Sequence, residues 1–102
     1  ILPATYLPVN CYREMFYNCS SLQVSNLHDL GHVTATGTAG TSCLDMFVGT
    51  GIKCYSSPAS GRQVFRTGAS NAQGTSAYNS MFDSGGDVTS LQPNTTYYVG
   101  RS

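Results

Sequence analysis

Two stretches of the chain, CYREMFYNCSS at residues 11–21 and CLDMFVGTGIKCYSS at residues 43–57, follow the same order of residue types. Each begins with a cysteine, passes an acidic residue and a Met-Phe pair, and ends on a second cysteine followed by two serines. We interpret each stretch as a β-hairpin, so that two related units share one core and each supplies one Met and one Phe to it. The alternative is a chance likeness within a biased composition.

The rest of the sequence follows an all-β pattern, because short apolar segments alternate with Gly, Ser, Thr and Asn at intervals of about ten residues. Strands are expected at 5–12, 21–25, 31–36, 42–48, 51–56, 63–66, 87–91 and 95–99. One short helix is expected at 77–82, where Tyr78, Met81 and Phe82 are spaced at i, i+3 and i+4. We therefore predict one domain over 1–102, a compact disulfide-stapled sandwich or Greek-key barrel built from two hairpin units.

The cysteine content indicates two disulfide bonds and an oxidising compartment. The four cysteines are Cys11, Cys19, Cys43 and Cys54. Their spacing lacks the paired C-x₂₋₄-C knuckles of a zinc site. Two kinds of pairing stay open, either within each unit (Cys11–Cys19 with Cys43–Cys54) or between the units (Cys11–Cys43 with Cys19–Cys54).

Three further features agree with a secreted, extracellular protein. Asn18 and Asn94 each begin an N-glycosylation sequon. No apolar run approaches the ~18 residues of a membrane span, so no transmembrane segment is expected. The opening residues Ile1-Leu2-Pro3 are read as the start of a chain whose leader has been removed.

The charge content argues against a nucleic-acid partner. Charged residues make up 10% of the chain, well below the roughly 25% of ordinary soluble proteins. Five Lys and Arg balance five Asp and Glu, so the formal net charge is zero. A neutral surface has no electrostatic footprint for nucleic acid or for an anionic membrane.

Residues 52–92 resemble one Greek key of the βγ-crystallin family. The opening hairpin of that family is similar to IKCYSSPASGRQVFRTG at 52–68, and its later loop and final strand are similar to YNSMFD at 78–83 and DVTSLQ at 87–92. The resemblance implies that Ser90 stands in the place of the family's fold-anchoring serine. Residues 85–90 lack the first pair of ligands of the family's calcium loop, so calcium does not carry over.

Two weaker likenesses concern other families. The stretch LQPNTTYYV at 91–99 resembles the tyrosine corner of fibronectin type III domains, although the chain ends too soon for that fold's final strand. Small secreted fungal proteins with paired cysteine-bounded hairpins are similar in composition, which implies a fungal source.

No set of residues predicts a catalytic, metal or cofactor site. His28 and His32 have the i, i+4 spacing of a chelating pair on a helix, but Gly31 lies between them and only Asp29 is near as a third ligand. We expect ordinary surface histidines. A secreted ribonuclease would need these histidines with an acid and a cation, such as Glu14 and Arg62, around a phosphate.

Glycosidase chemistry needs two facing carboxylates. Glu14 and Asp45 occupy similar places in the two repeats, but we expect them to serve as exposed turn residues. No Gly-x-Ser-x-Gly elbow is present. The sequence therefore favours a protein that is not an enzyme.

Seven tyrosines and no Trp give the chain its best binding groups, since a tyrosine ring supplies contact area and its hydroxyl supplies orientation. The predicted binding surface comprises Tyr12, Tyr17, Tyr55 and Tyr97. In TTYYVG, strand alternation places Tyr97 and Tyr98 on opposite faces, so one of the two is expected in the core.

We predict a secreted, non-enzymatic binding protein of the effector, toxin or defence type that recognises an extracellular protein or glycan. The alternatives are a sugar-binding lectin and a small secreted hydrolase, ribonuclease or protease inhibitor. An inhibitor would use an exposed loop at 57–62 or 68–76.

Overall fold

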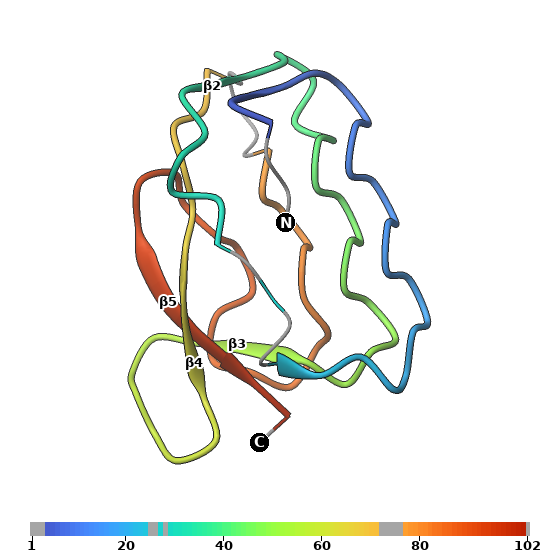
Figure 1. Cartoon of the computed structure of the whole chain (residues 1–102), viewed down its shortest axis with the longest axis vertical. Helices are drawn as coiled ribbons and strands as arrows, with labels where there is room; N and C mark the ends of the chain where they lie inside the picture. Colours follow the sequence, from blue (N-terminus) through green and yellow to red (C-terminus); the bar gives the residue numbers. More distant parts are fainter. Residues whose placement is uncertain (1–3, 25–26, 28, 72–76, 102) are drawn as a thin grey trace.

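The computed structural model describes residues 4–24, 27, 29–71 and 77–101. The described part contains no α-helix, which confirms the all-β prediction. Its strands are β1 (Tyr6–Leu7), β2 (Ala35–Thr36), β3 (Lys53–Tyr55), β4 (Gln63–Arg66) and β5 (Thr96–Gly100). β1 and β2 form a parallel pair, and β3, β5 and β4 form an antiparallel sheet with β5 in the middle (Figure 1).

The three-stranded sheet has one buried face and one face toward solvent. On β5 the side chains of Tyr97 and Val99 are buried, whereas Tyr98 between them is half-buried. This is the period-two alternation of a sheet with one solvated face. Because β5 lies between β3 and β4, residues 52–68 do not form the hairpin that was expected there.

Most of residues 8–20 and 41–50 forms overlapping β-turns rather than strands or hairpins. We call residues 8–20 the edge ribbon and residues 41–50 the central ribbon. Within each ribbon, every second residue donates its backbone N–H to the carbonyl three residues earlier. These bonds are Cys11 to Pro8, Arg13 to Asn10, Met15 to Tyr12, Tyr17 to Glu14, Cys19 to Phe16, Leu44 to Thr41, Met46 to Cys43, Val48 to Asp45 and Thr50 to Phe47, with N···O distances of 3.0–3.3 Å.

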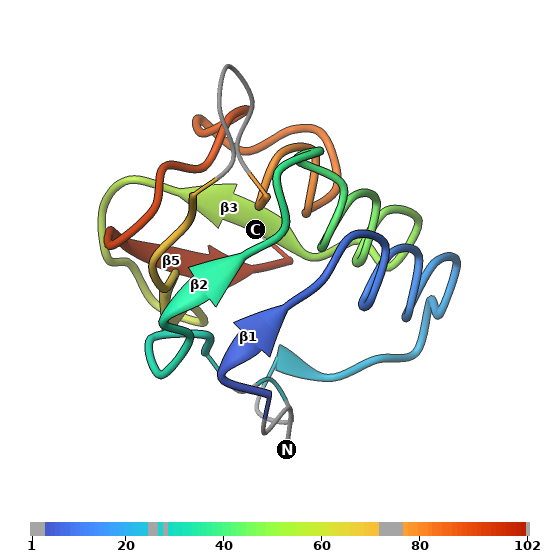
Figure 2. The same ribbon diagram turned by 90° about the horizontal axis from the view of Figure 1, so that it is seen from above.

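The remaining N–H groups join the ribbons side by side. The edge ribbon donates to the central ribbon from Tyr12 to Ser42, Glu14 to Leu44, Phe16 to Met46 and Asn18 to Val48, at 2.8–3.0 Å. The central ribbon donates to an inner segment (residues 77–83) from Cys43 to Ala77, Asp45 to Ser80 and Phe47 to Met81, at 2.7–3.0 Å. Figure 1 shows the three segments running next to one another, and Figure 2 shows the coiling of the two ribbons.

The three segments share a short motif that explains their shape. Met-Phe occurs at 15–16, 46–47 and 81–82, and the residue before each Met has a positive φ, namely 55° at Glu14, 55° at Asp45 and 50° at Ser80. In both ribbons this residue occupies the third position of its turn, where a type II turn requires positive φ. The sequence repeat is therefore a repeat of turns, and it has three copies rather than two.

The Phe of each copy contributes to one aromatic stack in the core. Phe16 stacks on Phe47 with ring centroids 5.3 Å apart, and Phe47 stacks on Phe82 at 4.8 Å. Phe65 of β4 meets Phe82 edge-on at 5.2 Å. The stack thus joins the ribbons to the sheet, and aromatic pairs of this kind add about 0.5–1.5 kcal/mol each beyond area burial.

Two interactions of the C-terminal part fix β5 in place. Tyr97 accepts a 2.7 Å hydrogen bond on its hydroxyl from the Gln92 backbone N–H, which ties β5 to the loop before it. The Arg101 guanidinium donates to the carbonyls of Thr50, Ser20 and Leu22, so it binds the ends of both ribbons.

Several expected elements are absent from the described residues. The predicted helix at 77–82 is the non-helical inner segment, because its backbone carbonyls bond to the central ribbon and Ser80 has positive φ. No strand forms at 42–48 or 87–91, nor in the described part of 21–25. No disulfide joins any of the four cysteines, so the expected staples are not formed. The structure supports small sheets in a compact globule, with a radius of gyration of 12.2 Å.

Candidate binding surface

Exposed apolar side chains gather on one part of the molecule. Among the described residues, five large hydrophobic side chains are exposed. Four of them, Tyr6, Val9, Met15 and Tyr17, lie on β1 and the edge ribbon, and Val64 of β4 is the fifth. Exposed apolar side chains concentrated on one segment are a common mark of an interaction site. We therefore regard the edge ribbon with β1 as the candidate binding surface.

The four tyrosines expected to form a binding surface are not brought together. Tyr17 lies exposed on the edge ribbon, and Tyr12 of the same ribbon packs half-buried against the core. Tyr55 lies on β3 in the three-stranded sheet. Tyr97 is only 6% exposed, so it is a core residue and not a surface residue, and Tyr98 is the one of the pair that faces outward.

The outer face of the three-stranded sheet carries a second group of side chains. Tyr55, Tyr98 and Val64 lie in register across β3, β5 and β4. The Arg62 guanidinium covers the Tyr55 ring, with its central carbon 3.5 Å from the ring centroid. This cation–π contact occupies one face of the ring, so Tyr55 has less surface left for stacking on a sugar.

Arg62 also anchors the exposed loop of 57–61, which includes the 57–62 stretch considered for a protease inhibitor. Its guanidinium donates to the Ser57 carbonyl at 3.0 Å, and its backbone N–H donates to the Ala59 carbonyl at 3.1 Å. Gly61 has φ 82°, which a turn of this kind requires at its third position.

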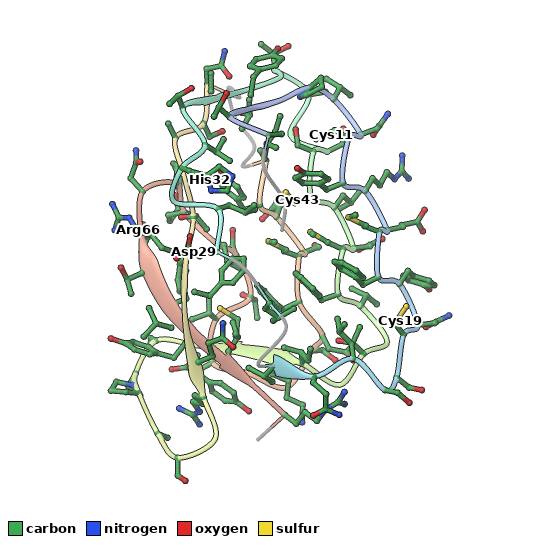
Figure 3. All side chains as sticks on the ribbon, viewed as in Figure 1. Cys11, Cys19, Asp29, His32, Cys43 and Arg66 are labelled. Carbon is green, nitrogen blue, oxygen red and sulfur yellow. The ribbon has the colours of Figure 1, made fainter. Side chains whose placement is uncertain are left out.

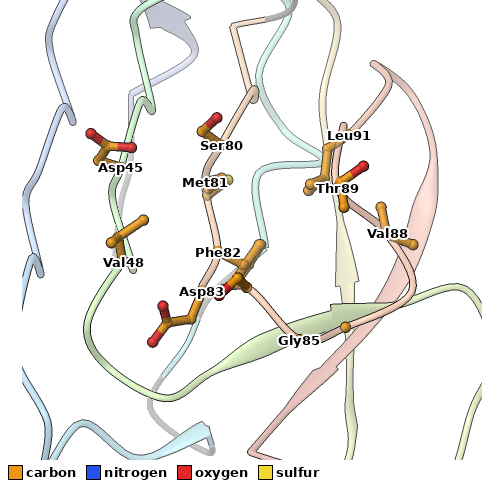
Figure 4. Close-up of a pocket in the computed structure, with 12 residues that line it drawn as sticks. Asp45, Val48, Ser80, Met81, Phe82, Asp83, Gly85, Val88, Thr89 and Leu91 are labelled. Carbon is orange, nitrogen blue, oxygen red and sulfur yellow. The ribbon is translucent and has the colours of Figure 1, made fainter.

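A pocket of about 320 Å³ lies between the central ribbon, the inner segment and residues 84–91 (Figure 4). Its acidic lining residues are Asp45 and Asp83, and its apolar lining includes Met81 and Leu91. Asp83 accepts a 2.9 Å hydrogen bond from the Gly51 N–H. No His, Lys or Arg is among the lining residues, so this pocket lacks the imidazole and cation of a ribonuclease site.

The residues considered for acid–base chemistry serve as turn residues where the structure describes them. Glu14 and Asp45 hold the positive-φ positions of their ribbons, as expected for turn chemistry. Asp29 accepts a 3.2 Å hydrogen bond from the Gly31 N–H. His32 lies exposed in the segment before β2, and His28 lies outside the described residues.

The cysteines fall into an exposed pair and a buried pair. Cys11 and Cys19 are exposed at opposite ends of the edge ribbon (Figure 3), whereas Cys43 and Cys54 are buried. Burial, and then the nearby Cys11, raises the pKa of Cys43 far above its ordinary value. Burial also raises the pKa of Cys54, to about 12, with Asp87 as the second cause. The buried thiols are therefore protonated at neutral pH and slow to react while the chain is folded.

Both sequon asparagines are exposed, and both have positive φ, 61° at Asn18 and 54° at Asn94. The Asn18 side chain stands over Gly49, where a Cβ would lie 2.0 Å from its Oδ1 atom. Asn18 belongs to the candidate surface, and Asn94 lies just before β5 on another part of the chain.

Sequence reasoning missed Tyr6, Val9 and Met15 as surface residues. The useful signal was the spacing of Asn10, Glu14 and Asn18, which lie four residues apart and all have positive φ. Asn is tolerant of such conformations, so a four-residue spacing of turn formers indicates that every second turn of the ribbon is of type II.

The described residues hold neither a cluster of metal ligands nor a membrane-spanning helix. In the described ranges, no three His, Cys, Asp or Glu side chains gather as a metal site would require. Within the same residues, no helix has the length and apolar character that crossing a bilayer requires. No protein-family model, curated protein or solved structure matches the chain.

Proposed function

We propose that the chain is a non-enzymatic binding protein that recognises a polypeptide partner through β1 and the edge ribbon. The observation that carries this proposal is that one segment, β1 with the edge ribbon, holds four of the five exposed large hydrophobics among the described residues, namely Tyr6, Val9, Met15 and Tyr17. Tyrosine and methionine are both enriched where proteins meet. A polypeptide is favoured over a glycan because the Tyr55 ring, the tyrosine best placed on the sheet, is covered by Arg62.

In this proposal the protein acts outside the cell, as an effector, toxin or defence protein. Its low charge, its sequons at Asn18 and Asn94 and its four cysteines support this location. Asn18 lies on the candidate surface, so a glycan on Asn18 would cover the end of that surface that contains Tyr17. The proposal therefore expects the glycan on Asn94, which glycopeptide mass spectrometry of the protein from culture medium would test.

Oxidation outside the cell is expected to join Cys11 to Cys43. The Tyr12 N–H binds the Ser42 carbonyl, and the Cys11 sulfur lies 3.9 Å from the same oxygen, so the two cysteines belong to adjacent ribbons in close register. The two thiols would lose two protons and two electrons to a thiol–disulfide oxidant, forming one S–S bond. Cys11–Cys19 is disfavoured because these residues lie at opposite ends of the edge ribbon (Figure 3).

The test is selection of a random-peptide display library against the full-length protein. We expect enriched peptides whose affinity falls at least about tenfold in the double variant Met15→Ser/Tyr17→Ser, since truncating central contacts costs about 1–2 kcal/mol or more. The matched control is Val64→Ser on β4, which is equally exposed but lies outside the candidate surface and leaves affinity unchanged.

A glycan array, probed with the same three proteins, tests the lectin alternative. Specific glycan binding that survives the double variant, together with no peptide enrichment, would replace the proposal with a lectin. Urea unfolding of all three proteins checks that these surface changes leave the fold intact, because such changes are usually worth within about 0.5 kcal/mol.

A further inference from the structure

One set of backbone carbonyls on the edge ribbon has no hydrogen-bond partner within the described part of the chain. The carbonyls of Cys11, Arg13, Met15 and Tyr17 accept no hydrogen bond from any described residue. The alternate carbonyls of the same ribbon, such as those of Tyr12 and Glu14, are used inside its turns. The unpartnered groups therefore recur at every second residue, as a row and not as isolated defects.

The direction of this row follows from peptide geometry. The described chain has no cis peptide bond, and in a trans peptide the C=O and the N–H of the next residue point in opposite directions. The N–H groups of Tyr12, Glu14, Phe16 and Asn18 all point at the central ribbon. The carbonyls that precede them must therefore point away from the central ribbon, toward the open side of the molecule.

The peptides of neighbouring ribbons continue this alignment. Tyr12 donates to the carbonyl of Ser42, and the N–H of the same peptide, on Cys43, donates to Ala77. Equivalent chains run from Glu14 and from Phe16 to the inner segment. Because peptide dipoles aligned head to tail add, as they do along a helix, the open carbonyl row is the negative end of several such chains.

An edge of this kind accepts hydrogen bonds and donates none. Two edge ribbons cannot pair with one another, since that would place carbonyl rows face to face. The central ribbon has an equivalent row of carbonyls, and the edge ribbon satisfies it. The edge ribbon does so by presenting a backbone N–H at every second residue, at positions 12, 14, 16 and 18.

Resting on the proposed polypeptide-binding function, we propose that the edge ribbon binds its partner by backbone addition. A segment of the partner adds as a further turn ribbon and donates alternate N–H groups to the carbonyls of Cys11, Arg13, Met15 and Tyr17. The exposed side chains of Met15 and Tyr17 lie along the same row and supply apolar contact. This resembles strand addition at a sheet edge, with the difference that all the donors come from the partner.

The test uses the full-length protein labelled with ¹³C and ¹⁵N, and two unlabelled probes. The first probe is a synthetic peptide of residues 8–20 with both cysteines replaced by serine, and the second is the tightest peptide from the library selection. We expect the carbonyl ¹³C resonances of Cys11, Arg13, Met15 and Tyr17 to move on titration. The carbonyls of Tyr12 and Glu14, which already accept turn hydrogen bonds, provide the internal control.

The matched control peptide keeps every side chain but carries N-methyl groups at the four alternate amides of positions 12, 14, 16 and 18. It is expected to bind at least about tenfold more weakly, because it lacks the donors. Met15→Ser/Tyr17→Ser is expected to weaken the unmodified peptide as well, while leaving the alternating pattern of carbonyl shifts in place.

Four results would overturn the inference. Binding of both peptides that depends on Met15 and Tyr17, with N-methylation leaving the affinity of the 8–20 peptide unchanged, would leave the proposed function standing and remove backbone addition. Movement of the same carbonyls on dilution alone would identify a second copy as the occupant. Movement on addition of calcium, or of free arginine, would identify a cation site. Absence of any peptide binding would remove both proposals together.

Discussion

The ribbon stack and the three-stranded sheet both join backbone segments through N–H and C=O groups, but they leave different edges. In the antiparallel sheet, successive residues of β4 and β5 point their groups in opposite directions, so each edge carries donors and acceptors together. In the stack, the edge ribbon sends every inter-ribbon N–H the same way, from Tyr12 through Asn18 to the central ribbon. The two-residue repeat of the turns therefore determines whether an edge carries hydrogen-bond donors, acceptors or both.

The edge and central ribbons differ in a second way, although they share one motif. Glu14-Met15-Phe16 and Asp45-Met46-Phe47 have the same backbone conformation at the acidic residue. Met15 is 49% exposed and Met46 is fully buried. Position in the stack, rather than local sequence, thus decides which Met stabilises the fold and which is available to a partner.

The largest expected contrast is in thiol reactivity. In protein kept reduced, Cys11 and Cys19 on the edge ribbon should react with iodoacetamide readily, whereas Cys43 and Cys54 should react at least about a thousandfold more slowly, because they are exposed only by large-scale unfolding. Mass spectrometry of partly alkylated peptides measures the four rates. Equal rates at Cys43 and Cys11 would show that the central ribbon is not buried as the structure has it.

Without a reductant, the same measurement reports on the oxidised protein. Protection of Cys11 and Cys43 together, with a cross-linked peptide between them, would support the inter-ribbon disulfide. A cross-linked peptide between Cys11 and Cys19 would instead require the edge ribbon to be rebuilt.

Truncating Met15 or Met46 to alanine compares how much the edge ribbon and the central ribbon contribute to the free energy of unfolding. Met46→Ala should lower the free energy of unfolding by about 2–5 kcal/mol, because it opens a cavity in the core. Met15→Ala should change it by less than about 0.5 kcal/mol, since the side chain is half in solvent. Urea unfolding measures both, and Met46→Leu serves as a volume-conserving control that should cost less than about 1.5 kcal/mol. A similar cost at both positions would contradict the edge assignment.

Alkaline pH should weaken the protein through its buried thiols, one in the central ribbon and one in the sheet. Burial raises the folded pKa of Cys54 to about 12, from an ordinary value of 9.0, and raises that of Cys43 further. Above pH 9 the unfolded chain loses these protons and the folded chain keeps them, so stability is full below pH 9 and falls as pH rises. Each thiol contributes a slope of about 1.4 kcal/mol per pH unit.

Urea unfolding at pH 8, 9 and 10 measures this slope. Cys54→Ala should remove the part of the pH slope that comes from the sheet and keep the part that comes from Cys43 of the central ribbon. A stability that stays flat from pH 9 to 10 in the reduced wild-type protein would contradict the burial of both thiols.

Arg101 connects the two regions, and its loss should have an intermediate effect. Its guanidinium reaches from the end of β5 to the carbonyls of Ser20, Leu22 and Thr50. Because the side chain is largely exposed, Arg101→Ala should cost about 1 kcal/mol. Arg101→Lys should recover only part of this, since one ammonium group cannot span three carbonyls. Hydrogen exchange should quicken at both ribbon ends while the sheet amides keep their protection.

The sheet was predictable from sequence and the ribbons were not, for a physical reason. β4 coincides with the predicted strand, β3 lies inside its predicted range and β5 is displaced by one residue, because alternating burial is a local signal. The ribbons and the inner segment depend on positive φ at Glu14, Asp45 and Ser80, a conformation that is uncommon for any residue other than glycine. A stretch such as CLDMFV therefore has the composition of a strand, although it forms turns.

The candidate surface was predicted only in part for the same reason. Tyr17 was expected at the surface and lies there, but Met15 has the composition of a core residue and is exposed only because no ribbon follows on its side. Tyr97 was expected at the surface and is buried, because its hydroxyl closes the turn at Gln92. Exposure in this fold depends on the order of the segments, which a single sequence does not show.

The smallest expected effect tests the turn geometry that distinguishes ribbon from strand. Glu14 has φ 55°, a conformation that costs an L-residue about 1–2 kcal/mol and costs glycine little. Glycine also loses more conformational entropy on folding, so Glu14→Gly should raise the free energy of unfolding by less than about 1 kcal/mol. Glu14→Val should lower it, because a β-branched residue resists positive φ. If residues 11–19 formed a strand, the order would be reversed, with Val stabilising and Gly destabilising. The sign of the difference between these two variants, measured by urea unfolding, therefore decides between a turn ribbon and a strand without reference to any partner.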